Sequence, residues 1–217
     1  INQTYTYKSQ GKEITEPMID MFKRCEFSRD EWFKIKQFCD DEKILFMSSP
    51  LNCSDLDLLV EINTPAIKLG STDFTNIPFL KYCTSTKLPI ILSCGMSFLS
   101  EIKEALTTVG AFDGYPTILL VTTSEYPTSS KDVNLLKFQK IKEEFPSIVL
   151  GFSDHTQGHL ASSLAVTFGA CVFEKHFTLD NNFPGPDHWF SENPSGLKNW
   201  INSIIISNEM MGSSEIK

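Results

Sequence analysis

The segment SIVLGFSDHTQGHLASSLAVTFGACVFEKHFT, residues 147–178, is typical of one strand–helix–strand unit. Short apolar strands are expected at 147–150 and 171–173, each followed by small polar residues, and an amphipathic helix lies between them. Two strands joined through a helix pair in parallel by a right-handed crossover. The unit therefore predicts an α/β fold.

The same pattern recurs along the chain. We expect six strands, at 44–47, 66–69, 89–92, 117–121, 147–150 and 171–173. An open doubly wound sheet and a closed barrel both fit such an alternation. Polar residues at the carboxyl end of every strand favour the barrel, because barrel enzymes place their sites there. No strand leads into a dinucleotide-binding glycine motif or a P-loop.

The predicted fold is thus a TIM-type (β/α)8 barrel with six of its eight units. The chain begins at Ile1 rather than Met, where the unit of a third strand would begin. We therefore expect residues 1–217 to be a single barrel domain that lacks its first two strands. Residues 1–27 show no clear period, and Ser28 with Glu31 forms a capping-box pattern that starts a helix.

Composition excludes several classes of function. The net charge of −8 argues against nucleic acid as a partner, because phosphate backbones require basic patches. Apolar runs such as 118–121 are too short to cross a membrane. The six cysteines form no CxxC pair, which predicts free core thiols and a cytoplasmic location.

Lys68 lies inside the expected strand 66–69 and shares a face with Ala66 and Gly70. If that face is the barrel interior, its ammonium needs an anionic partner, such as a substrate phosphate or carboxylate. A lysine on an edge strand that reaches solvent is an equal alternative.

Four serines follow the carboxyl ends of four expected strands: Ser71, Ser93, Ser124 and Ser153. Any one of them alone is better explained by a loop or a helix cap. Four around one rim, with Lys68 among them, favour an anion site.

His155 and His176 follow adjacent strands at the same level. Two neutral imidazoles side by side can bind one divalent metal. Two protein ligands do not make a structural zinc site, which has four. They suit Mn²⁺, or Mg²⁺, with positions open for substrate and water. Glu174 shares the face of His176 and is expected to orient ligands or substrate.

Two further positions are candidate substrate contacts. The stiff PGPDH loop at 184–188 could direct Asp187 into the barrel mouth, or it could be a surface turn. Tyr126 could donate to a sugar hydroxyl or simply pack. Asp73, in the loop after Lys68 and Ser71, joins Lys68 and Glu174 among the candidate catalytic residues.

Over roughly residues 28–210 the chain resembles the sialic acid synthase family, including its legionaminic and pseudaminic acid branches. The matching segments are FMSSP at 46–50, KLGS at 68–71, ILSCGM at 91–96, SEYPT at 124–128, SDHT at 153–156, EKHFT at 174–178 and PGPDH at 184–188. The last three together are the most specific.

The resemblance implies an enzyme that condenses phosphoenolpyruvate with an open-chain N-acetylmannosamine-type sugar and releases phosphate. It implies that His155 and His176 bind the metal, and that Tyr126 and Asp187 contact the sugar. The implied phosphoenolpyruvate pocket comprises Ser49, Lys68, Ser71, Ser93, Ser124 and Ser153.

This chain departs from the family pattern in several places. The family often has Thr at the positions of Ser49 and Cys94, and some members have Asn-Ile in place of Ser124-Glu125. The family's C-terminal antifreeze-like domain, which lends an arginine to the partner's site in a homodimer, has no counterpart in this sequence. A related synthase of the Kdo or DAHP type and a non-catalytic barrel remnant are the alternative functions.

Overall fold

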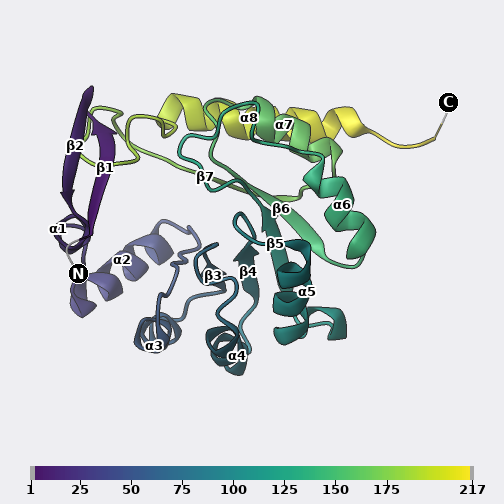
Figure 1. Ribbon diagram of the computed structural model, residues 1–217, viewed down its shortest axis with the longest axis horizontal. Coiled ribbons are helices and arrows are strands. Elements are labelled where there is room, and N and C mark those ends of the chain that lie inside the picture. The colour runs from purple at the N-terminus through teal and green to yellow at the C-terminus, as the bar shows by residue number, and fades with distance from the viewer. Residues whose placement is uncertain (1–2, 216–217) are drawn as a thin grey trace.

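The computed structural model describes residues 3–215, and a parallel sheet forms its centre (Figure 1). Within those residues the sheet has five strands in sequence order: β3 (Ile67–Leu69), β4 (Ile90–Ser93), β5 (Thr117–Val121), β6 (Val149–Asp154) and β7 (Val172–Lys175). Each neighbouring pair is parallel. The predicted α/β alternation is therefore confirmed.

Helices follow the strands and lie around the outside of the sheet (Figure 1). They are α3 (Cys53–Glu61), α4 (Ile77–Ser85), α5 (Leu99–Thr108), α6 (Lys137–Glu144), α7 (Leu160–Thr167) and α8 (Pro194–Met211), with a short 3-10 helix at Ala111–Asp113. The core lies between the sheet and these helices, where Leu69, Leu92 and Leu119 of the sheet pack with Leu80 and Phe138. Burial of such side chains stabilises a fold by roughly 1.5–3 kcal/mol each.

The sheet curls until its two edge strands face each other. Lys68 of β3 and Glu174 of β7 lie at opposite edges, yet the Lys68 ammonium is 3.4 Å from the Glu174 carboxylate. In a flat sheet, the first and fifth strands would be about 19 Å apart at the usual strand spacing. The curl therefore has the character of a half-barrel and excludes an open doubly wound sheet.

The segment 44–47 is not a strand, so this prediction was wrong. Residues 44–50 have no regular secondary structure. Ile44 and Leu45 are 63% and 77% exposed, although both are apolar. An apolar run forms a strand only where a neighbouring strand accepts its backbone hydrogen bonds, and none of the described strands pairs with this segment.

The N-terminal residues are more ordered than their sequence indicated. β1 (Thr4–Ser9) and β2 (Lys12–Pro17) form an antiparallel hairpin, and α1 (Met18–Lys23) follows. α2 (Arg29–Asp41) begins at the predicted capping box, in which Ser28 and Glu31 exchange hydrogen bonds. The hairpin lies beside the segment that connects β7 to α8 (Figure 1).

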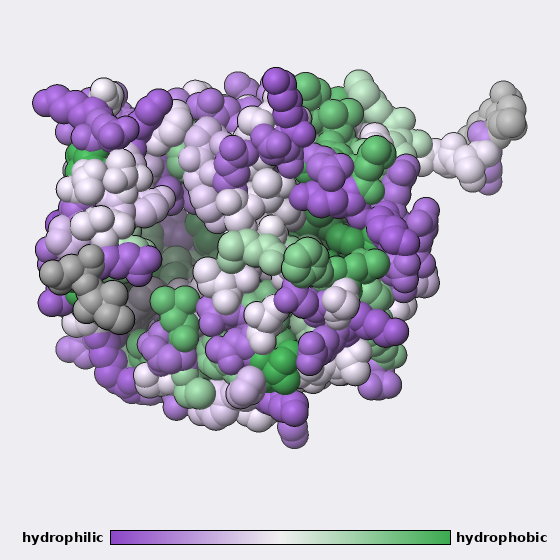
Figure 2. Space-filling model, in the orientation of Figure 1, coloured by the Kyte–Doolittle hydropathy of each residue, from purple (hydrophilic) through white to green (hydrophobic). Residues whose placement is uncertain are grey.

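The surface seen in Figure 2 is mainly polar, and its apolar residues gather at the upper right, over α6, α7 and α8. Exposed residues on these elements include Leu160, Leu164 and Ile205. Among the described residues, none of the helices is both long and apolar enough to span a membrane.

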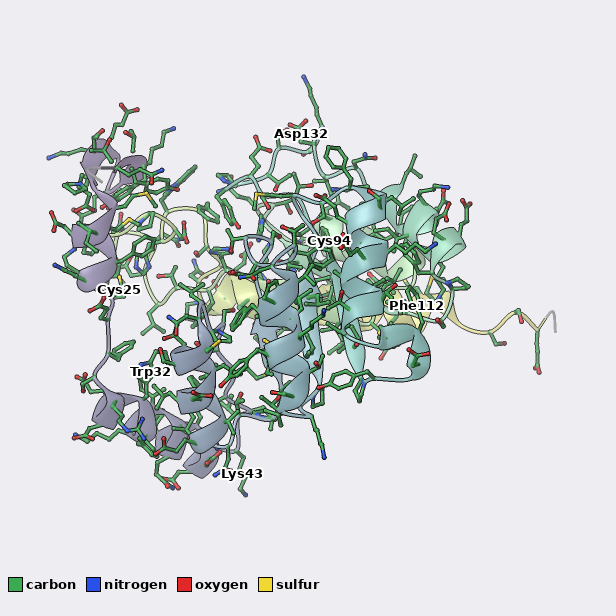
Figure 3. The ribbon with its side chains drawn as sticks, turned by 60° about the horizontal axis from the view of Figure 1, so that its bottom comes forward. Cys25, Trp32, Lys43, Cys94, Phe112 and Asp132 are labelled. Carbon is green, nitrogen blue, oxygen red and sulfur yellow. The ribbon has the colours of Figure 1, made fainter. Side chains whose placement is uncertain are left out.

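All six cysteines are free thiols, as predicted, but only Cys83 and Cys94 are buried. The expectation that most lie in the core was therefore wrong. Cys25 lies just after α1, at the left of Figure 3, whereas Cys94 lies near the centre, among the strands and the helices that cover them. Burial raises the pKa of the Cys94 thiol to about 12, so this group stays protonated.

Candidate functional site

The carboxyl ends of β6 and β7 carry two sets of side chains on opposite faces. β6 continues to Asp154, four residues beyond the predicted strand end at 150, because residues 151–154 pair with 172–175 of β7. Since side chains alternate along a strand, Ser153 and Glu174 share the inner face with the histidines that follow them. Asp154 and Lys175 share the outer face.

The inner face brings His155 and His176 together, as predicted. Their ring centroids are 5.3 Å apart and the rings are nearly perpendicular, at 82°. Burial lowers the pKa of both imidazoles. The two side chains are therefore neutral near pH 7, which is the form that binds metals.

Hydrogen bonds fix the tautomer of His155. Its Nδ1 is 2.7 Å from the carbonyl oxygen of Thr123, which can only accept, so Nδ1 carries the proton. Nε2 therefore has a lone pair, and it lies 3.3 Å from the hydroxyl of Ser153. Such a backbone contact on the far nitrogen is how proteins orient a ligating histidine. Nothing in the sequence had indicated this role of Thr123.

A chain of polar contacts crosses the interior from β3 to β7. The Lys68 ammonium donates to Ser93 Oγ at 2.9 Å and lies 3.4 Å from the carboxylate of Glu174. Ser153 Oγ donates to the other oxygen of Glu174 at 2.6 Å. Lys68 thus faces the interior although β3 is an edge strand, so it does not extend to solvent, and its anionic partner in this structure is a protein carboxylate.

Ser71 and Ser124 meet at the backbone of Gly95. The Gly95 amide donates to Ser71 Oγ at 3.0 Å. A Cβ atom at position 95 would lie 2.6 Å from Ser124 Oγ and 2.7 Å from the Thr122 methyl group. Only glycine fits such an approach without displacing its neighbours. Ser71, Ser93 and Ser124 therefore border one rim with Lys68.

Tyr126 and Asp187 complete the inner face on the side of the histidines. The Tyr126 ring lies over His155, with centroids 4.3 Å apart. Asp187 Oδ2 is 3.6 Å from His176 Nδ1, so the PGPDH loop does direct this carboxylate toward the site. Burial, followed by the charge of Asp187, raises the pKa of the Tyr126 hydroxyl, which is therefore protonated and able to donate.

The outer face holds a buried ion pair that no sequence pattern had indicated. Asp154 Oδ2 is 3.1 Å from the Lys175 ammonium, and their side chains are 0% and 2% exposed. The two residues are directly opposed in the β6–β7 register. Because the histidines follow them immediately, this pair fixes the relative position of the His155 and His176 backbones.

Lys137 of α6 is a second positioning group that had no signal in the sequence. Its ammonium donates to the Thr122 carbonyl at 3.0 Å and to Thr123 Oγ1 at 2.8 Å. Burial lowers the pKa of this lysine. The contacts hold the end of β5, whose Thr123 carbonyl orients His155.

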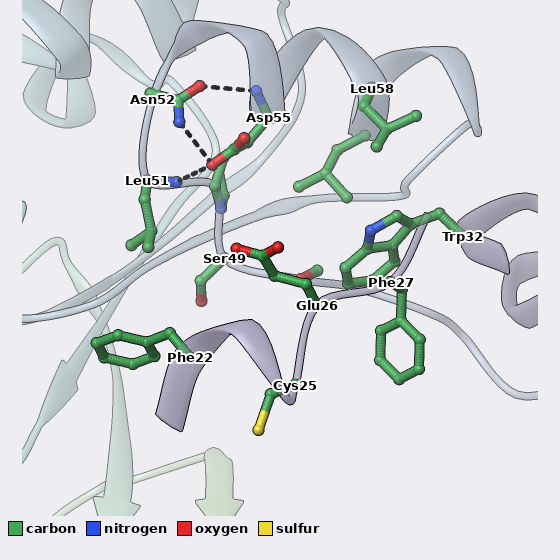
Figure 4. Close-up of a pocket in the computed structure, with 13 residues that line it drawn as sticks. Phe22, Cys25, Glu26, Phe27, Trp32, Ser49, Leu51, Asn52, Asp55 and Leu58 are labelled. Atoms are coloured by element: carbon green, nitrogen blue, oxygen red, sulfur yellow. Dashed lines mark hydrogen bonds between the residues drawn. The ribbon is translucent and has the colours of Figure 1, made fainter. Parts of the chain in front are cut away.

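Two predicted site residues lie apart from these contacts. Ser49 is exposed and lines a cavity of about 520 Å³ beside α1 and α2, with Glu26, Trp32 and Asn52 (Figure 4). Asp73 lies in the turn after β3, where it accepts from Thr72 Oγ1 at 3.2 Å. The roles assigned to both residues stay predictions.

The histidine pair fits the expectation of a loosely held divalent ion. Within residues 3–215, no three His, Cys, Asp or Glu side chains form a ready-made metal cage. The donors available are the neutral imidazoles, with the Asp187 carboxylate beside His176. Two imidazoles and one carboxylate are fewer than the four ligands of a structural zinc site, and the identity of the ion stays a prediction.

The model of the NeuB family matches residues 2–216. N,N'-diacetyllegionaminic acid synthase of Legionella pneumophila is 38% identical over 97% of this chain and 60% of its own length. N-acetylneuraminate-9-phosphate synthase of Homo sapiens is 32% identical over 98% of this chain and 58% of its own length. The chain thus spans about three fifths of these curated relatives.

Solved structures show the same likeness. N-acetylneuraminic acid synthetase from Leptospira borgpetersenii, solved in complex with citrate, superposes with a TM-score of 0.86 at 31% identity, covering 92% of this chain and 69% of that one. A truncated 3-deoxy-D-arabino-heptulosonate 7-phosphate synthase from Thermotoga maritima has a TM-score of 0.73 at 16% identity, over 86% of this chain and 74% of that one. The latter shows a shared fold only.

Proposed function

We propose that this chain, which belongs to the NeuB family, carries active-site residues for condensing phosphoenolpyruvate with an N-acetylmannosamine-type sugar. The products would be a nonulosonic (sialic) acid and phosphate. The observation that carries the proposal is the convergence of His155 and His176 with the Lys68–Glu174–Ser153 contacts on one interior face.

Phosphoenolpyruvate would bind at the rim bordered by Lys68, Ser71, Ser93 and Ser124. The Lys68 ammonium can exchange its contact with Glu174 for a substrate oxygen, because that contact is long, at 3.4 Å, and involves one carboxylate oxygen. Charge-assisted bonds to phosphate or carboxylate are about twice as strong as neutral ones. Hydroxyl groups add donors there without adding charge.

His155 and His176 would hold the divalent ion, with Mn²⁺ as the first candidate and Mg²⁺ as the second. When bound, the ion would supply Lewis-acid activation of the sugar aldehyde. Thr123 would keep Nε2 of His155 directed toward it, because the Thr123 carbonyl engages Nδ1. Asp187 and Tyr126, beside the two rings, would bind the sugar hydroxyl groups.

The reaction requires C3 of phosphoenolpyruvate to attack the aldehyde carbon. Water then adds to C2, and phosphate leaves with cleavage of the C–O bond. Glu174, whose carboxylate lies between Lys68 and Ser153 in the interior, would take the proton from that water. Holding the two reactants at attack distance would contribute to the rate by removing the entropic cost of bringing them together.

We also propose that two further strands, together with the segment 44–47, would add to the five described strands and complete an eight-stranded barrel beside β3. The apolar segment 44–47 is exposed on the N-terminal side of β3, and the cavity at Ser49 adjoins it. A homodimer, a cytoplasmic location and the absence of membrane or nucleic-acid partners stay predictions. The contact of Asp73 with Thr72, in the turn after β3, does not define a catalytic role.

Phosphate release tests the proposal. In a full-length background, stripped of metal, we expect phosphate only when phosphoenolpyruvate, an N-acetylated hexosamine and Mn²⁺ are all present. His155→Ala should abolish release, whereas His159→Ala, at an exposed histidine four residues away, should not. Full turnover without metal, or none with any N-acetylated hexosamine, would contradict the proposal and favour the non-catalytic alternative.

A further inference from the structure

Glu192, two residues before α8, connects the two segments that carry the proposed metal ligands. Its amide donates to the His176 carbonyl at 2.9 Å, and its own carbonyl accepts from the Thr178 amide at 2.9 Å. Its carboxylate contacts the other segment, where Oε1 accepts from the Gly158 amide at 2.8 Å. Glu192 therefore holds the backbone that follows β7 against the loop that follows β6.

The loop that follows β6 is held from two directions. From β7, the Lys175 ammonium donates to the carbonyls of Thr156 and Gly158 at 2.5 and 3.0 Å. From the segment before α8, the Glu192 carboxylate accepts from the Gly158 amide. This loop begins at His155, so the side chain of Glu192 helps to fix the separation between the backbones of His155 and His176.

Trp200, about two turns further along, contacts the same strands through their outer face. Its indole N–H donates to Ser162 Oγ at 2.8 Å, and Ser162 Oγ donates to Asp154 Oδ2 at 2.6 Å. Trp200 and Ser162 are 6% and 0% exposed. A hydroxyl has one proton, and since Ser162 gives it to Asp154, its lone pairs are left for the indole. This chain of bonds runs from α8 through α7 to the residue before His155.

α8 joins these two sets of contacts in one continuous element. It has 18 residues, and Asn193 caps its start by accepting from the Gly196 amide at 3.0 Å. It packs along α7 (Figure 1). The Trp200 ring also meets Phe173 of β7 edge to face, with centroids 6.4 Å apart. Because Glu192 adjoins the capped end and Trp200 lies within the helix, α8 constrains β6 and β7 together beside the two histidines.

We infer that α8 positions the histidine pair, and that Glu192 and Trp200 are positioning residues for the divalent ion. The inference rests on the proposed function, because it takes His155 and His176 as the ligands of that ion. Losing a bond that orients a metal ligand lowers metal affinity roughly ten- to a hundredfold. Glu192 and Trp200 act on the backbones of the ligands and not on their rings, so we expect the lower end of that range.

The test measures the Kd for Mn²⁺ by electron paramagnetic resonance of the free ion, in a full-length background stripped of metal. Glu192→Ala and Trp200→Phe should each raise this Kd about tenfold. Glu192→Gln keeps an acceptor for the Gly158 amide and should restore the parent Kd. In phosphate release, the Mn²⁺ concentration for half-maximal activity should rise by the same factor, while kcat at saturating Mn²⁺ stays unchanged.

Leu106→Ala is the matched control for a general loss of stability. Leu106 is 0% exposed on α5, the helix between β4 and β5, and its truncation should lower the urea midpoint while leaving the Kd for Mn²⁺ unchanged. Unchanged Kd values in Glu192→Ala and Trp200→Phe, or an equal rise in Leu106→Ala, would overturn the inference. A parent that binds Mn²⁺ but releases no phosphate would overturn the proposed function alone, and a parent that binds no Mn²⁺ would overturn both.

Discussion

Replacing Lys175 by Met should destabilise the protein by about 3–5 kcal/mol, the usual cost of removing one partner from a buried ion pair. The Lys175 ammonium contacts Asp154 Oδ2 at 3.1 Å and donates to the carbonyls of Thr156 and Gly158 at 2.5 and 3.0 Å. Methionine fills similar volume but supplies no donor. It leaves a carboxylate that is 0% exposed without its counter-charge, together with two carbonyls that lose their donor.

The remaining contacts of Asp154 determine how far the stability losses of Lys175→Met and Asp154→Asn differ. Its carboxylate also accepts from the Thr156 amide and hydroxyl and from Ser162 Oγ. Asp154→Asn keeps an acceptor for Thr156 and removes the charge, so we expect a smaller loss of about 1–3 kcal/mol. In the double variant neither charge is buried without a partner. Its loss of stability should therefore be smaller than the sum of the two single losses, by about 2 kcal/mol or more.

Urea unfolding of the purified protein, followed by tryptophan fluorescence, measures these differences as shifts of the midpoint. Lys140→Met is the matched control, because its pair with Glu144 is on the surface of α6 with side chains 58% and 43% exposed. That substitution should cost less than about 0.5 kcal/mol. Equal losses for Lys175→Met and Lys140→Met, or strictly additive losses in the double variant, would refute the reasoning.

Three other results are expected. His155→Ala and His176→Ala should each lose Mn²⁺ and most activity, with the double variant scarcely worse, because groups that act as one unit are not additive; single variants that keep tight Mn²⁺ binding would refute the site. Lys68→Ala should lower kcat/KM for phosphoenolpyruvate, because it removes a charge-assisted bond and with it roughly 2–4 kcal/mol of transition-state stabilisation. An unchanged kcat/KM would contradict the proposed role of Lys68. Hydrogen bonds from Arg24 and Tyr7 lower the pKa of Glu16 from 4.5 to about 2. The stability that these bonds give the hairpin is therefore present above pH 4.5 and is lost as the pH falls to about 2. Hydrogen exchange of the hairpin amides should show this loss in the parent protein and not in Glu16→Gln.

The strands of the sheet were predictable because each is a short apolar run followed by polar residues. Their ends were not, since β6 extends through the polar residues 151–154 only because β7 accepts its hydrogen bonds. Residues 44–47 failed for the opposite reason, having the apolar composition of a strand but no strand beside them. Pairing, which is a property of two segments, overrode the local pattern in both cases.

The hairpin did have a signal that went unused. Thr, Tyr and Lys alternate in residues 4–8, and Gln10-Gly11 follows as a two-residue turn with φ of 52° and 72°. Positive φ at both central residues is the geometry of the commonest hairpin turns, for which glycine is favoured. The low hydrophobicity of both strands concealed this pattern.

The histidine pair was predictable because residues at matched ends of adjacent parallel strands lie at one level. The contact of Lys68 with Glu174 was not, because it joins the two edge strands of the sheet and depends on the curl. The buried partner of Asp154 was equally hidden, since both Asp and Lys ordinarily lie at the surface.

The bond between Ser9 and Gly185 joins residues 176 positions apart in the chain, and this separation determines when the hairpin can dock on the loop after β7. The hairpin itself is local and closes within about 1–10 μs. During synthesis at about 5–20 residues per second, it would then wait roughly 10–35 s before Gly185 is made. The hairpin thus docks only after the strands of the sheet have been made, so a partly folded chain could bring His155 and His176 together before the hairpin is joined to the Asp187 loop.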